Sequence, residues 1–213
     1  FTLPILFGSL LQQLYNTADT IIVGHFVSED ALSAVGTTSS FIFFVMAIAM
    51  GFSAGNGVLV AQYYGAKNEA EVRKSSSTGI IMLLFMGLII SVISFFIARP
   101  AYTYFVAVPN SILELTIRYF QIYSFGIIFQ YGYNIFSYIL RAIGDSAATL
   151  YFLLIASVLN IFLDLFFVIV LKMGVDGVAI ATDISQAISF VCAYLYMVKK
   201  YPIFRFKFNE FVC

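Results

Sequence analysis

Charged residues are scarce in this sequence. Only 10% of its 213 residues are Asp, Glu, Lys or Arg, against about 25% in a typical soluble domain. The formal net charge is zero, so nothing points to a nucleic acid or to a strongly acidic partner. Hydrophobic residues make up 62% of the chain and form long runs. Such runs indicate membrane-spanning helices rather than the core of a large soluble domain.

Residues that commonly carry catalysis or bind metals are also few. The two cysteines, Cys192 and Cys213, are isolated and do not suggest a disulfide framework or a metal site. No nucleophile elbow, phosphate loop or metal-ligand spacing is present. The nearest match to the G-x-G-D string of intramembrane aspartyl proteases is at 142–145, and it lacks the first glycine. The sequence therefore does not favour an enzyme.

The beginning of the sequence carries no processing signal. It has no initiator methionine, no basic leader and no small-residue cleavage site, and it starts inside a hydrophobic segment. We therefore expect a fragment, or a true start that lies upstream.

Six hydrophobic segments are long enough to cross a bilayer, which takes about 20 residues. Short connections with turn chemistry separate them. The sequence thus predicts an all-α membrane protein, a six-helix transmembrane bundle with helices at approximately 1–24, 34–64, 77–98, 114–140, 147–171 and 177–198.

Basic residues predict the orientation. With the N-terminus in the cytoplasm, eight basic residues fall inside and three fall outside, as the positive-inside rule favours. The inner eight are Lys67, Arg73, Lys74, Arg141, Lys199, Lys200, Arg205 and Lys207, and the outer three are Arg99, Arg118 and Lys172. The proline- and aromatic-containing stretch 99–113 is expected to lie at the outer membrane surface without spanning it.

The first segment carries polar residues that are costly in a membrane. A carboxylate such as Asp19 costs roughly 2.5–3.5 kcal/mol on insertion scales, so it suggests a function. Helical spacing places it on one face with Gln12, Tyr15 and Asn16, and Pro4 would permit a bend near the cytoplasmic end. The alternative is an inert polar stripe that packs inside a bundle.

The fifth segment carries a second carboxylate. Asn160 and Asp164 are i, i+4 neighbours on one helix face. Their oxygens suit either Na⁺ or a proton held on a buried carboxyl group. The alternative is an Asn–Asp pair that only fixes helix packing.

Depth relates these residues to the sixth segment. Counting from the outer helix ends at 1.5 Å per residue places Asp19, Asp164 and Thr182 at roughly the same depth, about 8–11 Å below the outer surface. Three polar side chains at one depth can converge on one ion. The adjacent Asp183 points about 100° away and is not assigned to this site.

The fourth segment carries the clearest polar stripe, and the second segment carries a weaker pattern. A polar and aromatic stripe along the fourth would line a water-filled cavity or form a buried seam, and consists of Tyr119, Tyr123, Gly126, Gln130, Asn134, Ser137 and Arg141. In the second segment, Gly51 and Gly55 form G-x-x-x-G, which favours close helix packing.

Several longer strings resemble one family. They are LPILFGSLLQQLYNTADTIIVGHF, ALSAVGTTSS, GFSAGNGVLVAQYYGAKN, ILRAIGDSAATLY, SVLNIFLDLFF and GVDGVAIATDISQ. Together they resemble the multidrug and toxic compound extrusion (MATE) transporters, most of all the NorM/DinF-like branch, over essentially the whole chain.

The resemblance implies a twelve-helix fold of two six-helix lobes, of which this chain matches the N-terminal lobe (1–213) and lacks the C-terminal one. It implies an ion site at Asp19, Asn160, Asp164 and Thr182, with Tyr119 and Asn134 at matching positions of helix four. It also implies that the chain lies in the lipid bilayer of a bacterial inner (plasma) membrane.

The function expected from residues and resemblance is cation-coupled antiport. Na⁺ or H⁺ would drive export of small organic cations by alternating access, with no other cofactor. The substrate cavity would be lined by Gln12, Tyr15, Asn16, Tyr119, Tyr123, Gln130 and Asn134. Two alternatives stay open: a lipid-linked saccharide flippase of the same superfamily, and a non-transporting half-protein.

Overall fold

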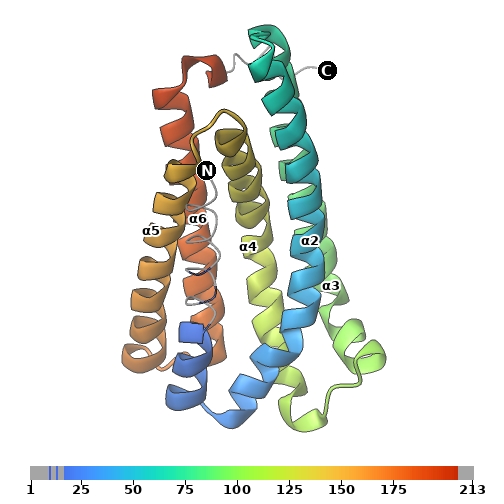
Figure 1. The fold of residues 1–213 in the computed structure, drawn as a ribbon. Helices are drawn as coiled ribbons and strands as arrows, with labels where there is room; N and C mark the ends of the chain where they lie inside the picture. The colour runs from blue at the N-terminus through green and yellow to red at the C-terminus, as the bar shows by residue number, and fades with distance from the viewer. Residues whose placement is uncertain (1–9, 11–12, 14–16, 206–213) are drawn as a thin grey trace.

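The computed structural model describes residues 10, 13 and 17–205, and every regular element in them is helical (Figure 1). Residues 17–26 are helical and precede five long helices. Short segments extend or follow some of these: the π-helical η1 (Ala101–Phe105) and η2 (Phe166–Val170), and the 3₁₀ turn η3 (Pro202–Phe204). The long helices are α2 (Glu29–Gly65), α3 (Glu69–Pro100), α4 (Asn110–Ala142), α5 (Ser146–Leu165) and α6 (Val175–Lys200).

The predicted fold class is confirmed. The described residues contain five helical stretches long and apolar enough to cross a membrane, and these correspond to the second to sixth predicted segments. Most of the first predicted segment lies outside the described residues, as do Pro4, Gln12, Tyr15 and Asn16.

Two predicted connections, at 25–30 and 65–74, are shorter than expected because the helices continue beyond the apolar runs. At 25–30, helix continues through Phe26 and α2 already begins at Glu29. The Ser28 hydroxyl accepts a hydrogen bond from Ala31 N at 3.0 Å, which caps α2. At 65–74, α3 begins at Glu69 rather than near residue 77. Asn68 caps it in the same way, and the acidic residues in both first turns favour an early helix start.

The expected surface stretch at 99–113 is also largely helical. Pro100 ends α3 and lacks a backbone N–H, and the next five residues adopt the wider π-helical turn. Val106 N donates to Ala101 O at 3.0 Å, which closes that turn. Only residues 106–109 separate η1 from α4.

α4 is the central helix of the bundle. Half of its apolar window is buried, against 22–39% in the four other candidate spans. Figure 1 shows it enclosed by α2 and α3 on one side and by α5 and α6 on the other. The helix therefore provides the surface against which both sides of the bundle pack.

Contacts between α4 and α6 follow a constant register. Arg118 forms an ion pair with Asp176, and Gly126 and Gly132 admit Asp183 and Phe190. A Cβ at Gly126 would lie 1.9 Å from Asp183 Oδ1, and one at Gly132 would lie 2.3 Å from Phe190 Cε2. The paired positions differ by 57 or 58 residues throughout, so the two helices run parallel and in step.

The G-x-x-x-G pattern of α2 does not form the expected close helix contact. A Cβ at Gly51 or Gly55 would meet no described atom within 4 Å. Gly57 is the position where α2 approaches α4, because a Cβ there would lie 3.4 Å from Tyr138. The packing prediction for Gly51 and Gly55 is therefore wrong within the described chain.

At one end of the bundle, Asp145 accepts hydrogen bonds that link α5 to α6 and the residue after it. This carboxylate caps α5 by accepting from Ala148 N at 3.4 Å. It also accepts from Tyr196 at 2.8 Å, Tyr201 at 2.7 Å and Lys200 at 3.0 Å. Burial alone would raise the pKa of Asp145, but these hydrogen bonds and the Lys200 charge outweigh it and lower the pKa from its ordinary value of 3.8.

Candidate ion site

The candidate site lies where the first helix meets α5 and α6. Asp19 comes from the helical residues 17–26, Asn160 and Asp164 from α5, and Thr182 from α6. The i, i+4 spacing puts both α5 side chains on the face that meets the neighbouring helices. The structure thus brings together the four residues that the sequence proposed as an ion site.

The amide of Asn160 bridges the two carboxyl groups. In the orientation that satisfies its neighbours, its nitrogen donates to Asp19 Oδ1 at 2.8 Å and to Asp164 Oδ2 at 3.1 Å. The other end of the amide lies 3.4 Å from Thr182 Oγ1. Asp19 and Asp164 also contact each other directly. Four polar side chains from three helices therefore form one connected network.

This network is buried and has spare acceptor capacity. Asn160 and Asp164 are fully buried, and Asp164 Oδ1 has no hydrogen-bond partner among the described residues. A buried acceptor without a partner is unfavourable, and two adjacent carboxylates repel each other. A proton or a small cation bound between them would relieve both penalties. Oxygen ligands suit a hard cation such as Na⁺.

The described part of the chain offers no alternative site for a transition metal. It contains no group of three or more His, Cys, Asp or Glu side chains that could hold one.

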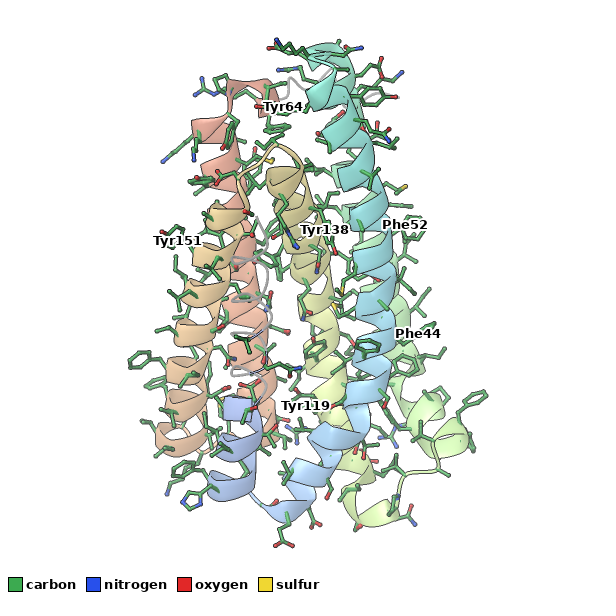
Figure 2. The ribbon with its side chains drawn as sticks, in the orientation of Figure 1. Phe44, Phe52, Tyr64, Tyr119, Tyr138 and Tyr151 are labelled. Atoms are coloured by element: carbon green, nitrogen blue, oxygen red, sulfur yellow. The ribbon has the colours of Figure 1, made fainter. Side chains whose placement is uncertain are left out.

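The predicted stripe of α4 is buried beside this network. Tyr119 and Tyr123 stack with ring centres 6.2 Å apart, and Tyr123 OH donates to Gln130 Oε1 at 3.0 Å. Asn134 Nδ2 bonds the Gln130 carbonyl at 2.8 Å. Figure 2 shows Tyr119 in the half of the bundle that holds residues 17–26.

These side chains are covered by the rest of the chain. The exposed fractions of Tyr119, Tyr123 and Gln130 are 5%, 8% and 7%. Gln130 Nε2 has no described partner, which leaves one donor available in this region. That they line a substrate cavity stays a prediction.

The sequence did not identify how Asp183 is placed. Its carboxylate lies against the α4 backbone at Gly126, and Oδ1 has no described partner. The available signal was the single glycine within the polar stripe of α4. Thr182 and Asp183 thus face different neighbours: the first contacts α5 and the second contacts α4.

The comparisons with known proteins agree with this architecture. The MatE family model matches residues 4–166. A probable multidrug resistance protein of Bacillus subtilis (YpnP) is 29% identical over 199 residues, which cover 93% of this chain and 44% of that protein. Other relatives bear the names NorM and DNA damage-inducible protein F, each at 28% identity, which supports the predicted branch.

Solved structures of transporters share the fold of this chain. A transporter of the MOP superfamily from Pyrococcus furiosus superposes with a TM-score of 0.91 at 26% identity, covering 99% of this chain and 46% of that one. An outward-facing multidrug resistance MATE family transporter gives 0.88 at 27% identity, covering 99% and 47%.

The chain thus spans less than half the length of the relatives it matches. The matched residues, the helical architecture and the relatives agree: the chain belongs to the MatE family of multidrug efflux transporters, which are integral membrane proteins and not enzymes.

Proposed function

We propose that this chain is the N-terminal, ion-coupling lobe of an antiporter that uses Na⁺ or H⁺ to export organic cations. The observation that carries the proposal is the Asn160 amide, which bridges Asp19 and Asp164 while Asp164 Oδ1 has no partner among the described residues. A merely structural network would be expected to satisfy its buried acceptors. The partner in this proposal is a second six-helix lobe of a longer protein.

The proposed mechanism is alternating access. The ion stabilises one state of the lobe by binding at Asp19, Asn160, Asp164 and Thr182, and the exported compound stabilises the other. Linkage requires that the two ligands oppose each other when they favour opposite states. In a one-for-one exchange of a monovalent ion for a monovalent organic cation, no net charge crosses the membrane, so the concentration gradient of the ion drives export. A tenfold ion gradient supplies about 1.4 kcal/mol, which supports roughly a tenfold gradient of the exported compound.

Charge favours a cationic substrate over a lipid-linked saccharide. The network and its surroundings contribute the carboxylates of Asp19, Asp164 and Asp183 and the aromatic rings of Tyr119 and Tyr123. Carboxylates attract cations and aromatic faces stabilise them. No Lys or Arg takes part in the hydrogen bonds described at this site.

Efflux from vesicles tests the proposal. The longer protein that contains this chain is reconstituted, and export of a fluorescent organic cation is followed at fixed membrane potential with either a Na⁺ or a pH gradient. Efflux should follow one gradient, and both Asp19→Asn and Asp164→Asn should abolish that coupling. Asn preserves the shape of Asp but removes its charge.

Asp145→Asn is the matched control, because it makes the same change on the connection before α5. It should leave ion dependence intact in protein of equal amount. Coupled efflux that survives in Asp19→Asn and Asp164→Asn would exclude the proposed ion site.

A further inference from the structure

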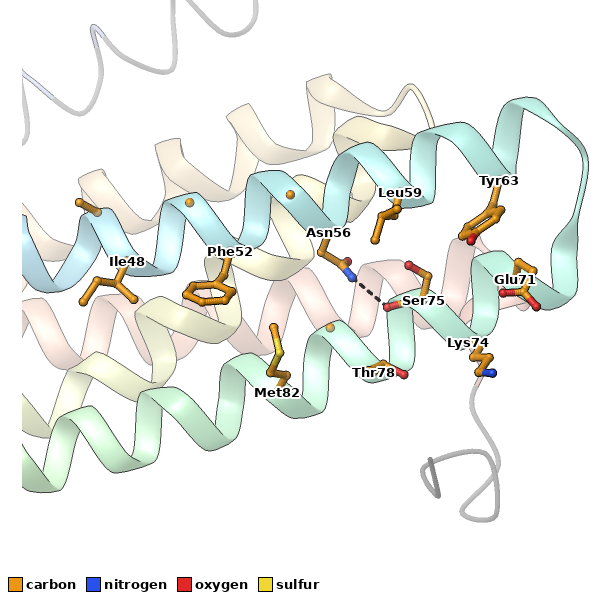
Figure 3. A pocket seen from close by; sticks show the side chains of 14 residues that line it. Ile48, Phe52, Asn56, Leu59, Tyr63, Glu71, Lys74, Ser75, Thr78 and Met82 are labelled. Carbon is orange, nitrogen blue, oxygen red and sulfur yellow. Dashed lines mark hydrogen bonds between the residues drawn. The ribbon is translucent and has the colours of Figure 1, made fainter.

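A separate hollow lies between α2 and α3, away from the ion site (Figure 3). It measures about 720 Å³, within the range of roughly 300–1,000 Å³ that small-molecule sites occupy. Of the residues predicted to line a substrate cavity, none of those that the structure describes (Tyr119, Tyr123, Gln130 and Asn134) contributes to it. The predicted substrate cavity therefore does not account for this hollow.

A hydrogen bond at the base of the hollow links α2 to α3. Asn56 Nδ2 donates to Ser75 O at 2.9 Å, and Gly79 leaves the space that this amide occupies, since a Cβ there would lie 2.4 Å from Asn56 Nδ2. Gly51 and Gly55 keep the hollow open, because no described atom lies within 4 Å of a Cβ at either position. The hollow thus exists because glycines line it where a hydrogen bond holds α2 and α3 together.

Polarity changes along the length of the hollow. Its inner part is apolar, with Ile48, Phe52 and Met82, and its end carries Glu71 and Lys74 (Figure 3). On α3, Glu71 and Met82 are eleven residues apart, or about 16 Å at 1.5 Å per residue. One leaflet of the hydrocarbon core is about 15 Å thick, half of ~30 Å. The change from apolar to charged lining residues therefore spans about the thickness of one leaflet, and Glu71 and Lys74 lie at the level of the lipid head groups.

The two charges follow a definite order. Lys74 lies one helical turn deeper than Glu71, roughly 4–5 Å along the helix axis. Neither side chain forms an ion pair with another described residue. Along a phosphatidylethanolamine molecule, the acyl chain is followed by the phosphate and then by the primary ammonium. The apolar wall, Lys74 and Glu71 present complementary groups in that same order.

We propose that the hollow between α2 and α3 binds a phospholipid whose head group ends in a primary ammonium. The acyl chain lies over Gly51 and Gly55, Lys74 binds the phosphate, and Glu71 accepts hydrogen bonds from the ammonium. A choline head group has no N–H to donate. A glycerol head group has no positive charge for Glu71. The site therefore selects for head-group chemistry, which general contact with the bilayer would not do.

Native mass spectrometry of the chain tests this selection. The chain is purified in mild detergent with equal amounts of phosphatidylethanolamine, phosphatidylcholine and phosphatidylglycerol that carry identical acyl chains. Phosphatidylethanolamine should be retained about two- to fivefold over each of the others, the range expected for exposed ion pairs. Equal retention of the three lipids would overturn the proposal.

Two variants test which residues cause the preference for phosphatidylethanolamine. Exchanging the charges, Glu71→Lys with Lys74→Glu, keeps the net charge but reverses the order, and should remove the preference. Gly55→Leu should fill the hollow and eliminate retention. Gly36→Leu is its control, because nothing lies within 4 Å of a Cβ there either and Gly36 is outside the hollow.

Two results would assign the hollow to another occupant. A dimer that Gly55→Leu abolishes would indicate a second copy of the chain. Selection present in the chain but absent from the longer protein would indicate that another segment covers the hollow. An unchanged preference after the charge exchange would likewise contradict the assigned contacts, even if Gly55→Leu folded poorly.

Discussion

Asp145 and Asp164 are carried near opposite ends of α5, about 28 Å apart along the helix, and their environments differ. Asp145 accepts hydrogen bonds from two tyrosines, a lysine and a backbone amide. Asp164 is fully buried, receives the shared Asn160 amide and keeps one oxygen without a described partner. The first carboxylate is fully satisfied by the protein, whereas the second keeps an acceptor that could bind a ligand. The difference separates a carboxylate that holds the fold together from one suited to bind an ion.

Removing the bridging amide should have the largest effect. Asn160→Leu deletes the donor to both carboxyl groups, at a cost of about 1–3 kcal/mol for each unsatisfied group, and should weaken ion dependence about 10- to 100-fold. Efflux measured over a range of ion concentrations gives the size of this loss. Ser157→Ala is the control, because among the described residues that hydroxyl bonds only the Leu153 carbonyl of its own helix, at 2.8 Å. An equal loss in both variants would mean that general packing, not the network, is responsible.

At the other end of α5, the expected loss is in stability. Asp145→Ala removes a helix cap, worth about 1 kcal/mol, and the acceptor of several hydrogen bonds, worth about 1.5–3 kcal/mol. The free energy of unfolding should fall by about 2–4 kcal/mol, measured by thermal or denaturant unfolding in detergent. Ion dependence measured on the folded fraction should stay unchanged. A shift in ion dependence would remove the distinction between the two carboxylates.

Asp183 tests an intermediate case, since its Oδ1 is unpaired but lies against the α4 backbone. Gly126→Ala would force Asp183 or α4 to move, at about 1–3 kcal/mol for overpacking. Gly55→Ala is the matched change at an open position and should cost far less. Equal stability of the two variants, measured by unfolding, would show that the contact between α4 and α6 adapts freely.

The smallest effect concerns pH. The pKa of Asp145 is lower in the folded chain than its ordinary value of 3.8, so the folded state favours the carboxylate. Its stabilising contribution is complete above pH 4 and is lost as the pH falls through the lowered pKa. The stability difference between wild type and Asp145→Asn should therefore shrink below pH 4. A difference that grows on acidification would contradict the assigned hydrogen bonds.

Sequence patterns predicted which side chains the structure brings together at the candidate ion site. Helical periodicity placed Asn160 and Asp164 on one face, and counting from helix ends placed Asp19 and Thr182 at the same depth. Both arguments need only the geometry of single helices. They apply here because a membrane gives each helix a common depth reference.

Contacts that depend on helix pairing were not accessible in this way. The approach of Asp183 to Gly126 requires the register between α4 and α6, and hydrophobic periodicity does not specify it. Helix starts were placed too late because apolar runs end before the helices do, although Ser28 and Asn68 are recognisable caps. The open surface at Gly51 and Gly55 was missed because G-x-x-x-G does not say whether a partner helix is present.

The constant register between α4 and α6 has a consequence for how the sequence can change during evolution. Inserting or deleting one residue in α4 between Arg118 and Gly132 would rotate the following residues by about 100°. Gly132 would then no longer face Phe190, while Arg118 would still face Asp176. Substitutions on the outer surface of α4 should be tolerated, but its length is restricted. A change in the length of one helix would need a matching change in the other.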